Sequence, residues 1–387
     1  MDAGADSLEE DLHLSKDCVL VARHNPWLSD NTNIADIAAT NPTVAARKRT
    51  TAGITATITY QAATPPLAGG TATYLTDRIL AADPTSVLKP LVVDGEDHSN
   101  DWSISDFTAT ELKKWIGGTT YDAATLRPST LNGQYPVLSM QEIIDLAKAK
   151  SKLTGRTITV YPETKNPYWN NAQGIANGCD TAGTGHPFED AVVKLVNDNG
   201  WNSKTAPIFL QSFDPTSLKY MRSKGLATRM VQLIDGNDVN YKTGAMIYET
   251  NDYWTIVDGR PYSWTLVGDG RYFDAMLTPA GLAEIKTYAD GIGPWKPQVM
   301  KLSGSAGTFA GVDSAVPTSL IADAHKAGLF VHVYTFRNES KYLAGVFKGD
   351  PEAELLTYLR AGVDGVFTDF SNTAVPTRAK YLKEMGR

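Results

Sequence analysis

The sequence predicts an α/β fold of the TIM (β/α)8-barrel type. Its 387 residues, of which 42% are hydrophobic, are enough for one large barrel that carries insertions, since this fold begins at about 250 residues and accepts long loops. Short β-rich runs alternate with helical patterns through much of the chain. Polar side chains follow directly after several of these runs. The alternation is typical of βα units in a parallel sheet and argues against a β-sandwich.

The predicted strands are short apolar runs bounded by polar or turn-forming residues. They lie at residues 18–22, 157–161, 208–212, 231–234, 330–335 and 365–370. The helices predicted between them have apolar residues at helical spacing, and each has Pro or Ser near its start, as helix N-termini prefer. These helices lie at residues 139–149, 187–196, 317–327 and 351–361.

Two stretches interrupt the alternation. Residues 33–103 are rich in Ala, Thr, Gly and Pro and contain a basic triplet at 47–49, whereas residues 235–301 are rich in Gly, Tyr and Trp. We interpret both as insertions in a single barrel domain that spans residues 1–387. The composition of the first stretch also allows a linker or a disordered segment, but the second is too aromatic for disorder.

Residues 7–12 admit two interpretations, a strand or the start of a helix. As a helix, Ser7 and Glu10 would form an S-x-x-E capping box. As a strand, the period of two places Glu9 and Asp11 on one face, where two adjacent carboxylates repel each other unless a hard cation such as Mg²⁺ or Ca²⁺ joins them. Glu10 would then lie on the opposite face, for which we have no physical explanation.

Further polar residues follow two of the apolar runs, at the position where barrels place catalytic groups. Arg23 and His24 follow the run that ends at residue 22, and Glu163 and Lys165 follow the run that ends at residue 161. The carboxylate of Glu163 could bind a metal and the ammonium of Lys165 a phosphate oxygen, or the two could form an ion pair.

Charge and composition exclude several classes of protein. The net charge of −7 gives no basic footprint for a nucleic acid. Cys18 and Cys179 lie far apart without metal-ligand spacing, so we expect neither a disulfide framework nor a zinc site. No apolar run reaches the roughly 20 residues of a membrane span, and the first residues do not form a signal peptide.

Together, the motifs resemble those of glycerophosphodiester phosphodiesterases of the secreted bacterial type. In order along the chain, they are LEEDL at 8–12, SKD at 15–17, VLVARH at 19–24, SDFT at 105–108, EL at 111–112, LRP at 126–128, YPETK at 161–165, QSF at 211–213, VQL at 231–233, YADGIGPW at 288–295, TFRNE at 335–339 and GVDGVFTDF at 362–370. Each motif is weak alone. Their order and spacing over nearly the whole chain make the resemblance strong.

The resemblance implies a TIM barrel that hydrolyses glycerophosphodiesters to sn-glycerol 3-phosphate and an alcohol. It implies one divalent cation, Ca²⁺ or Mg²⁺, bound by Glu9, Asp11 and Glu163, with His24 as a catalytic histidine. It places Lys165 on the phosphate and assigns four further residues to substrate binding, namely Arg23, Tyr334, Gln211 and Phe213. The implied partners are small-molecule glycerophosphodiesters, and the implied location is periplasmic or extracellular.

Two departures from the family pattern qualify the resemblance. Asn25 follows His24 where close relatives have an acidic residue, and no His-Arg-Gly motif, which would supply the second catalytic histidine, occurs in the sequence. We therefore count strands two to eight and expect strand one and helix one to be missing, through truncation. The edges at residues 8–12 and 365–370 should then lie about 10 Å apart, or meet at about 4.8 Å in a distorted ring.

Two other functions stay open. The missing histidine favours a catalytically impaired barrel that binds phosphodiesters. A related phospholipase would need exposed apolar loops at the mouth of the barrel. The aromatic residues of the second insertion could provide such loops, although aromatic residues usually pack; they are Tyr248, Tyr253, Trp254, Tyr262 and Trp264.

Overall fold

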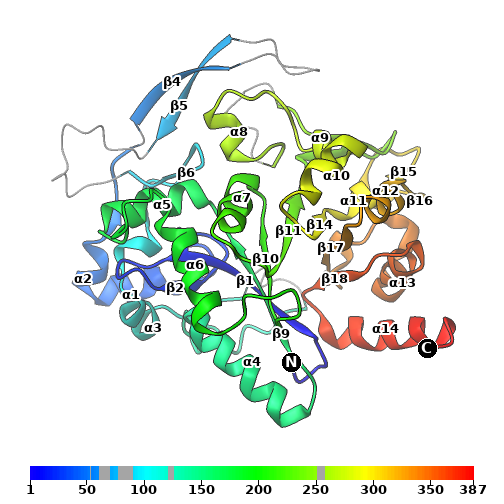
Figure 1. The fold of residues 1–387 in the computed structure, drawn as a ribbon, viewed down its shortest axis with the longest axis horizontal. Coiled ribbons are helices and arrows are strands. Elements are labelled where there is room, and N and C mark those ends of the chain that lie inside the picture. Colours follow the sequence, from blue (N-terminus) through cyan, green and yellow to red (C-terminus); the bar gives the residue numbers. More distant parts are fainter. Residues whose placement is uncertain (53, 61–69, 77–89, 121–125, 251–257) are drawn as a thin grey trace.

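A computed structural model gives the fold of residues 1–387 (Figure 1). The residues that the structure describes are 1–52, 54–60, 70–76, 90–120, 126–250 and 258–387.

The centre of the molecule is a curled eight-stranded sheet with helices around it (Figure 1). Its strands, in spatial order, are β18 (Gly365–Thr368), β17 (Phe330–Phe336), β14 (Gly291–Pro294), β11 (Arg229–Ile234), β10 (Phe209–Ser212), β9 (Thr159–Thr164), β1 (Ser7–Leu14) and β2 (Leu20–Ala22). All neighbours from β18 to β1 are parallel, whereas β1 and β2 are antiparallel. This arrangement confirms the predicted TIM-type α/β fold.

The first strand settles the choice between strand and helix for residues 7–12. β1 pairs with β9 over six positions, from Ser7 opposite Thr159 to Leu12 opposite Thr164. Leu12 and Leu14 are fully buried in the main hydrophobic core, so one face of the strand is anchored by apolar packing. Pairing with β9 and this burial outweigh the local capping signal, because tertiary packing overrides weak local preferences.

Strand β2 differs from the prediction that residues 18–22 continue the parallel series. β2 forms a short antiparallel hairpin with β1, with Leu14 opposite Leu20. The connection is too short for a parallel crossover, which needs a dozen or more residues. Cys18 in this turn has a positive φ of 66°, a conformation that tight turns require.

The sheet is open between its β1 and β18 sides. Among the described strands, no hydrogen-bonded ladder joins β1 to β18, so the closed seven-strand ring does not form. Instead, Arg378 of the C-terminal helix α14 (Ser371–Glu384) forms an ion pair with Asp6, immediately before β1. The last helix of the chain therefore packs beside the first strand.

The predicted helices are confirmed as α4 (Met140–Thr154), α6 (Pro187–Asp198), α12 (Leu320–Lys326) and α13 (Pro351–Ala361). The start of α4 is stabilised by a capping box in which Ser139 and Glu142 bind each other's backbone amides. Additional helices around the sheet are α5 (Pro167–Ala176), α7 (Pro215–Ser223) and α10 (Pro279–Lys286).

The described part of the first insertion forms helices and short strands outside the main sheet. Its described elements are α1 (Ile34–Thr40), α2 (Pro42–Ala45), β3 (Lys48–Arg49), β4 (Ile54–Tyr60), β5 (Gly70–Thr76), β6 (Val92–Val93), β7 (Glu96–Asp97) and β8 (Asp101–Trp102), followed by the 3₁₀ turn η1 (Ile104–Asp106) and α3 (Ala109–Trp115). A second hydrophobic cluster holds part of this unit together, with Ile34, Trp102 and Phe107 buried at its centre.

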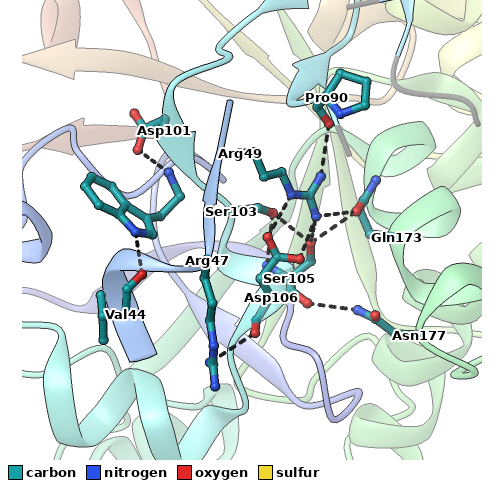
Figure 2. A network of polar contacts seen from close by, with 11 residues as sticks. Val44, Arg47, Arg49, Pro90, Asp101, Ser103, Ser105, Asp106, Gln173 and Asn177 are labelled. Atoms are coloured by element: carbon teal, nitrogen blue, oxygen red, sulfur yellow. Dashed lines mark hydrogen bonds and ion pairs between the residues drawn. The ribbon is translucent and has the colours of Figure 1, made fainter. Parts of the chain in front are cut away.

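Hydrogen bonds of Arg49 join the first insertion to helix α5 of the barrel (Figure 2). Its buried guanidinium donates to both carboxylate oxygens of Asp106, at 2.7 and 2.8 Å. It also donates to Gln173 of α5 at 2.9 Å and to Ser105 at 3.2 Å. Two groups of the basic triplet are thus structural, because Arg47 also pairs with an acid, Glu111 of α3, at 2.6 Å.

The second insertion is shorter than predicted. Strand β14 of the main sheet lies inside residues 235–301, so the excursion ends before α10. Its described elements are β12 (Asp238–Asn240), β13 (Ala245–Ile247), α8 (Tyr262–Leu266) and α9 (Asp274–Leu277). Another excursion follows β14 and contains α11 (Lys296–Val299), β15 (Met300–Ser303), η2 (Phe309–Gly311) and β16 (Ser314–Pro317), and the turns η3 (Ser340–Tyr342) and η4 (Gly345–Phe347) follow β17.

The expectation that the cysteines stay apart is wrong. Cys18 and Cys179 form a disulfide that joins the β1–β2 turn to the loop after α5, with Cα atoms 5.5 Å apart although 161 positions separate them in sequence. The pairing depends on the packing of α5 beside β1, which cysteine spacing does not reveal.

None of the helices in the described part of the chain is long and apolar enough to cross a membrane.

Candidate active site

Three carboxylates meet on the inner side of strands β1 and β9. Asp11 and Glu163 are register partners, and Glu9 lies two positions before Asp11 on the same face. One oxygen from each of the three residues lies within 4.8 Å of the other two. The structure therefore brings together the three residues that the sequence singled out.

The surroundings shift the pKa values of the three carboxyl groups in different directions. Burial, followed by the charge of Asp11, raises the pKa of Glu9 well above its ordinary value. Burial also raises the pKa of Glu163 to about 8. Burial also acts to raise the pKa of Asp11, but the charges of Lys165 and His24 together hold that pKa below its ordinary value. Three carboxylates this close repel one another unless a cation joins them, and their oxygens are the ligands that a hard divalent cation prefers.

Lys165 and His24 lie beside the cluster. Lys165 Nζ is 3.0 Å from His24 Nε2 and 3.5 Å from Asp11 Oδ1. Although burial opposes its charge, the carboxylates of Asp11, Glu163 and Glu9 raise the pKa of Lys165. Burial, then the charge of Lys165, lowers the pKa of His24. His24 Nε2 thus accepts a hydrogen bond from a permanently charged ammonium.

Asn25 completes the surroundings of His24. His24 Nδ1 donates to Asn25 Oδ1 at 2.7 Å, and Asn25 Nδ2 donates to Asp30 at 2.6 Å. His24 is thus linked to the carboxylate of Asp30 through one intervening amide. The departure noted at Asn25 therefore changes the hydrogen bonding of His24 without leaving Nδ1 unpartnered.

The predicted binding residues Gln211, Phe213 and Tyr334 line the same cavity, which has a volume of 1260 Å³. Gln211 is buried and donates to Glu9 at 2.7 Å. Tyr334 donates its hydroxyl to the Ile234 carbonyl at 3.0 Å and meets the ring of Phe213 edge-on. The three carboxylates, His24 and Lys165 also line this cavity, and Glu9 and His24 are the most exposed of these five residues.

The structure does not place Arg23 in this cavity. Its guanidinium donates to the carbonyls of Trp27, at 3.0 Å, and Asp30, and Arg23 is absent from the residues that line the cavity. Arg23 instead shapes the loop that follows His24.

Asp235 is a cavity residue that the sequence did not single out. It follows β11 directly, and burial followed by the charge of Asp258, which also lines the cavity, raises its pKa to about 8. Its position just after the predicted strand 231–234 is the signal that could have identified it. His13, which continues the alternation of Glu9 and Asp11, was not singled out either; it is fully buried and does not line the cavity.

The aromatic residues of the second insertion do not form an exposed apolar rim in the described part of the chain. Tyr248 and Trp264 are buried, with exposed fractions of 7% and 9%. Tyr262 lines the cavity. Tyr253 and Trp254 lie outside the described residues.

Comparisons with known proteins agree with this geometry. The pattern of the glycerophosphoryl diester phosphodiesterase family matches residues 1–373. Glycerophosphodiester phosphodiesterase GDPD6 of Arabidopsis thaliana is 29% identical over 381 residues, which is 96% of this chain and 78% of that protein. Glycerophosphodiester phosphodiesterase of Haemophilus influenzae is 25% identical over 294 residues, which is 73% of this chain and 70% of that protein.

A solved structure with a similar fold is that of a protein from Silicibacter pomeroyi DSS-3 described as a glycerophosphoryl diester phosphodiesterase. The TM-score is 0.50 and the sequence identity 15%, and the similarity covers 100% of this chain and 85% of that chain. This similarity supports the fold, while the sequence match over residues 1–373 supports the family. The chain belongs to the glycerophosphoryl diester phosphodiesterase family of enzymes.

Proposed function

We propose that the protein hydrolyses glycerophosphodiesters to sn-glycerol 3-phosphate and an alcohol with the help of one divalent cation. The observation that carries the proposal is the single cavity in which the cluster of Glu9, Asp11 and Glu163 lies beside the Lys165–His24 contact of 3.0 Å. Acidic oxygens for a cation, an ammonium for a phosphate and a histidine for proton transfer are the groups that phosphodiester hydrolysis needs.

Glu9, Asp11 and Glu163 would hold the cation, Ca²⁺ or Mg²⁺. When bound, the cation would neutralise charge on the phosphate oxygens. Gln211, which donates to Glu9, would keep that carboxylate in its position. Lys165 would bind a phosphate oxygen directly, because its ammonium lies within the same cavity and keeps its charge.

His24 would move a proton at the attacking or the leaving oxygen, while the phosphorus–oxygen bond to the alcohol breaks. Its Nε2 is open to the cavity and lacks a proton in the observed hydrogen bond with Lys165. The attacking group would be water, or the 2-hydroxyl of the glycerol, in which case the cyclic phosphate formed as the alcohol leaves would then be opened by water to sn-glycerol 3-phosphate. Tyr334 and Phe213 would form the wall against which the glycerol packs.

A catalytically impaired barrel that binds phosphodiesters is the second candidate. Among the described residues that line the cavity, the histidines are His24 and His332. His332 lies in an aromatic layer, where its Nδ1 is 2.9 Å from the Tyr161 hydroxyl, and burial lowers its pKa to about 4. His332 therefore does not supply the second proton carrier that hydrolysis by the family pattern would use.

The disulfide supports a location in an oxidising compartment. Disulfides persist in the periplasm and outside the cell and are rare in the cytosol. The pairing of Cys18 with Cys179 therefore favours a periplasmic or extracellular protein.

The proposed function is tested by measuring release of glycerol 3-phosphate from glycerophosphocholine with Ca²⁺, with Mg²⁺ and after removal of metal by EDTA. We expect hydrolysis with one of the cations and none with EDTA. Glu9→Gln should lose at least about 100-fold in kcat. Glu10→Gln is the matched control, because Glu10 lies on the opposite face of β1.

Cation binding without hydrolysis of this or any other glycerophosphodiester would favour the impaired barrel. Hydrolysis that survives EDTA, or an equal loss in Glu10→Gln, would contradict the proposed role of the cluster.

A further inference from the structure

His13 and Asn170 form a fully buried polar pair beneath the candidate active site. Both side chains are 0% exposed. His13 lies on β1, two positions after Asp11, and Asn170 lies on α5, five positions after Lys165. The ring of Trp169 packs edge-on against the imidazole.

The hydrogen bonds of this pair have a defined direction. Asn170 Oδ1 accepts the Leu14 backbone N–H at 2.9 Å, so its amide nitrogen must point the other way. That nitrogen donates to the Lys165 carbonyl at 2.6 Å and to His13 Nδ1 at 2.9 Å. Since Nδ1 accepts, the ring proton of neutral His13 lies on Nε2, which donates to the His24 carbonyl at 3.3 Å.

The two ends of this chain of hydrogen bonds are the backbone carbonyls of His24 and Lys165. These are the residues whose side chains must stay 3.0 Å apart in the cavity. They lie on loops that follow β2 and β9, which are not neighbours in the sheet. The buried pair therefore ties together two loops that the sheet does not join directly.

We infer that His13 and Asn170 are positioning residues that fix the His24 loop relative to the Lys165 loop. The inference rests on the proposed function for its catalytic meaning, but the coupling of the loops is a property of the structure alone. Small displacements of catalytic groups are costly, and about 1 Å can reduce the rate about 100-fold.

Hydrogen–deuterium exchange of the full chain tests the coupling without relying on activity. We expect Asn170→Ala to speed exchange about tenfold in residues 22–28, which it does not touch, as well as in residues 164–170. His13→Val should have the same effect on both segments. His13→Gln should retain protection at residues 22–28, because its amide nitrogen can donate to the His24 carbonyl in place of Nε2.

Steady-state kinetics on glycerophosphocholine provide the second measurement. His13→Val should lower kcat roughly 10- to 100-fold with little change in KM, and His13→Gln should recover most of the loss. His186→Gln is the control, because His186 lies at the start of α6, makes no capping hydrogen bond with its side chain and does not line the cavity. The double variant His13→Val/Asn170→Ala should lose no more than the worse single variant, since the pair acts as a unit.

These experiments distinguish a failure of the proposed function from a failure of the coupling between the loops. Faster exchange in both loops with no hydrolysis by the unchanged protein would contradict the proposed function and support the coupling. Asn170→Ala with unchanged exchange at residues 22–28, or His13→Val with a lower melting temperature but unchanged kcat, would overturn the inference.

Discussion

Lys165 lies among three carboxylates of the candidate site, since Asp11, Glu163 and Glu9 all act on its ammonium. It keeps its charge in a buried position because these carboxylates compensate for the loss of water. Its charge in turn lowers the pKa of His24, after the effect of burial. A single side chain thus provides a phosphate contact and sets the proton affinity of the neighbouring base.

Replacing Lys165 should therefore change both binding and pH dependence. Lys165→Met removes a positive neighbour from His24, so the pKa of His24 should rise. The limb of the pH–rate profile that reports His24 should move to higher pH, and kcat/KM should fall about 100-fold. Lys148→Met on the exposed face of α4 is the control. If this limb of the pH–rate profile does not move in Lys165→Met, the charge of Lys165 does not lower the pKa of His24.

At the scale of the element, strand β14 shows that packing against neighbouring strands can require residues that strands disfavour locally. A Cβ atom at Gly291 would lie 2.3 Å from the ring of Phe330, and one at Gly293 would lie 2.6 Å from Leu233. Glycine is required at 291 because the ring of Phe330 occupies the space, whereas a side chain at 293 would have to displace the methyl end of Leu233. Glycine disfavours strands in isolation, which is why residues 291–294 read as part of an insertion.

Gly291→Ala should lower the free energy of unfolding by about 1–3 kcal/mol through this clash. Urea denaturation measures the change. Phe330→Leu in the same chain should restore part of the loss, because the smaller side chain leaves room for the new methyl group. If the losses of unfolding free energy in the two single variants simply add in the double variant, Phe330 is not the group that the new methyl contacts.

The Arg47–Glu111 pair links the first insertion to helix α3. Two hydrogen bonds of 2.6 and 2.8 Å join the side chains, and the pair lowers the pKa of Glu111 to about 2. The unfolded chain protonates this carboxyl near its ordinary value of 4.5. Stability from the pair is therefore complete above about pH 4.5 and is lost as the pH falls toward 2.

Glu111→Gln should lower the free energy of unfolding by about 1–2 kcal/mol at pH 7 and by much less at pH 2.5. Thermal unfolding across this range measures the difference between the variant and the unchanged protein. A difference that is the same at both pH values would mean that the ion pair does not account for the loss.

The limits of prediction from sequence are clearest at this scale. Strands β10, β11, β17 and β18 follow from apolar runs, and the cluster of Glu9, Asp11 and Glu163 follows from period-two alternation at strand ends. Two features depend on long-range neighbours and left no local trace, namely the membership of β14 in the sheet and the Cys18–Cys179 bond. The antiparallel direction of β2 does have a local cause, the short connection from β1, which the prediction did not use.

At the scale of the whole molecule, one barrel sheet supports two separate hydrophobic cores. The larger core lies between the sheet and its helices, and the second lies in the first insertion. Helix α5 connects them, because Gln173 binds the Arg49 network, Asn170 binds His13, and the disulfide follows the end of the helix. The site therefore depends on a helix that also holds the insertion in place.

Removing the disulfide should destabilise the whole protein. The bond restricts an unfolded loop of 161 positions, for which chain entropy predicts about 4–5 kcal/mol. Cys18→Ser/Cys179→Ser should unfold at lower urea concentration, and dithiothreitol should destabilise the unchanged protein but not the double variant. Equal sensitivity of both proteins to dithiothreitol would contradict this assignment of the stabilisation.

The same bond makes a covalent ring of the chain between Cys18 and Cys179. Asp11 lies outside the ring, whereas His24, Glu163 and Lys165 lie inside it. Cutting any one peptide bond within the ring still leaves a single covalent molecule, with all four residues attached to each other. A protease that cleaves the first insertion would thus produce two bands on a reducing gel and one on a non-reducing gel, and the broken backbone would not release either half of the site.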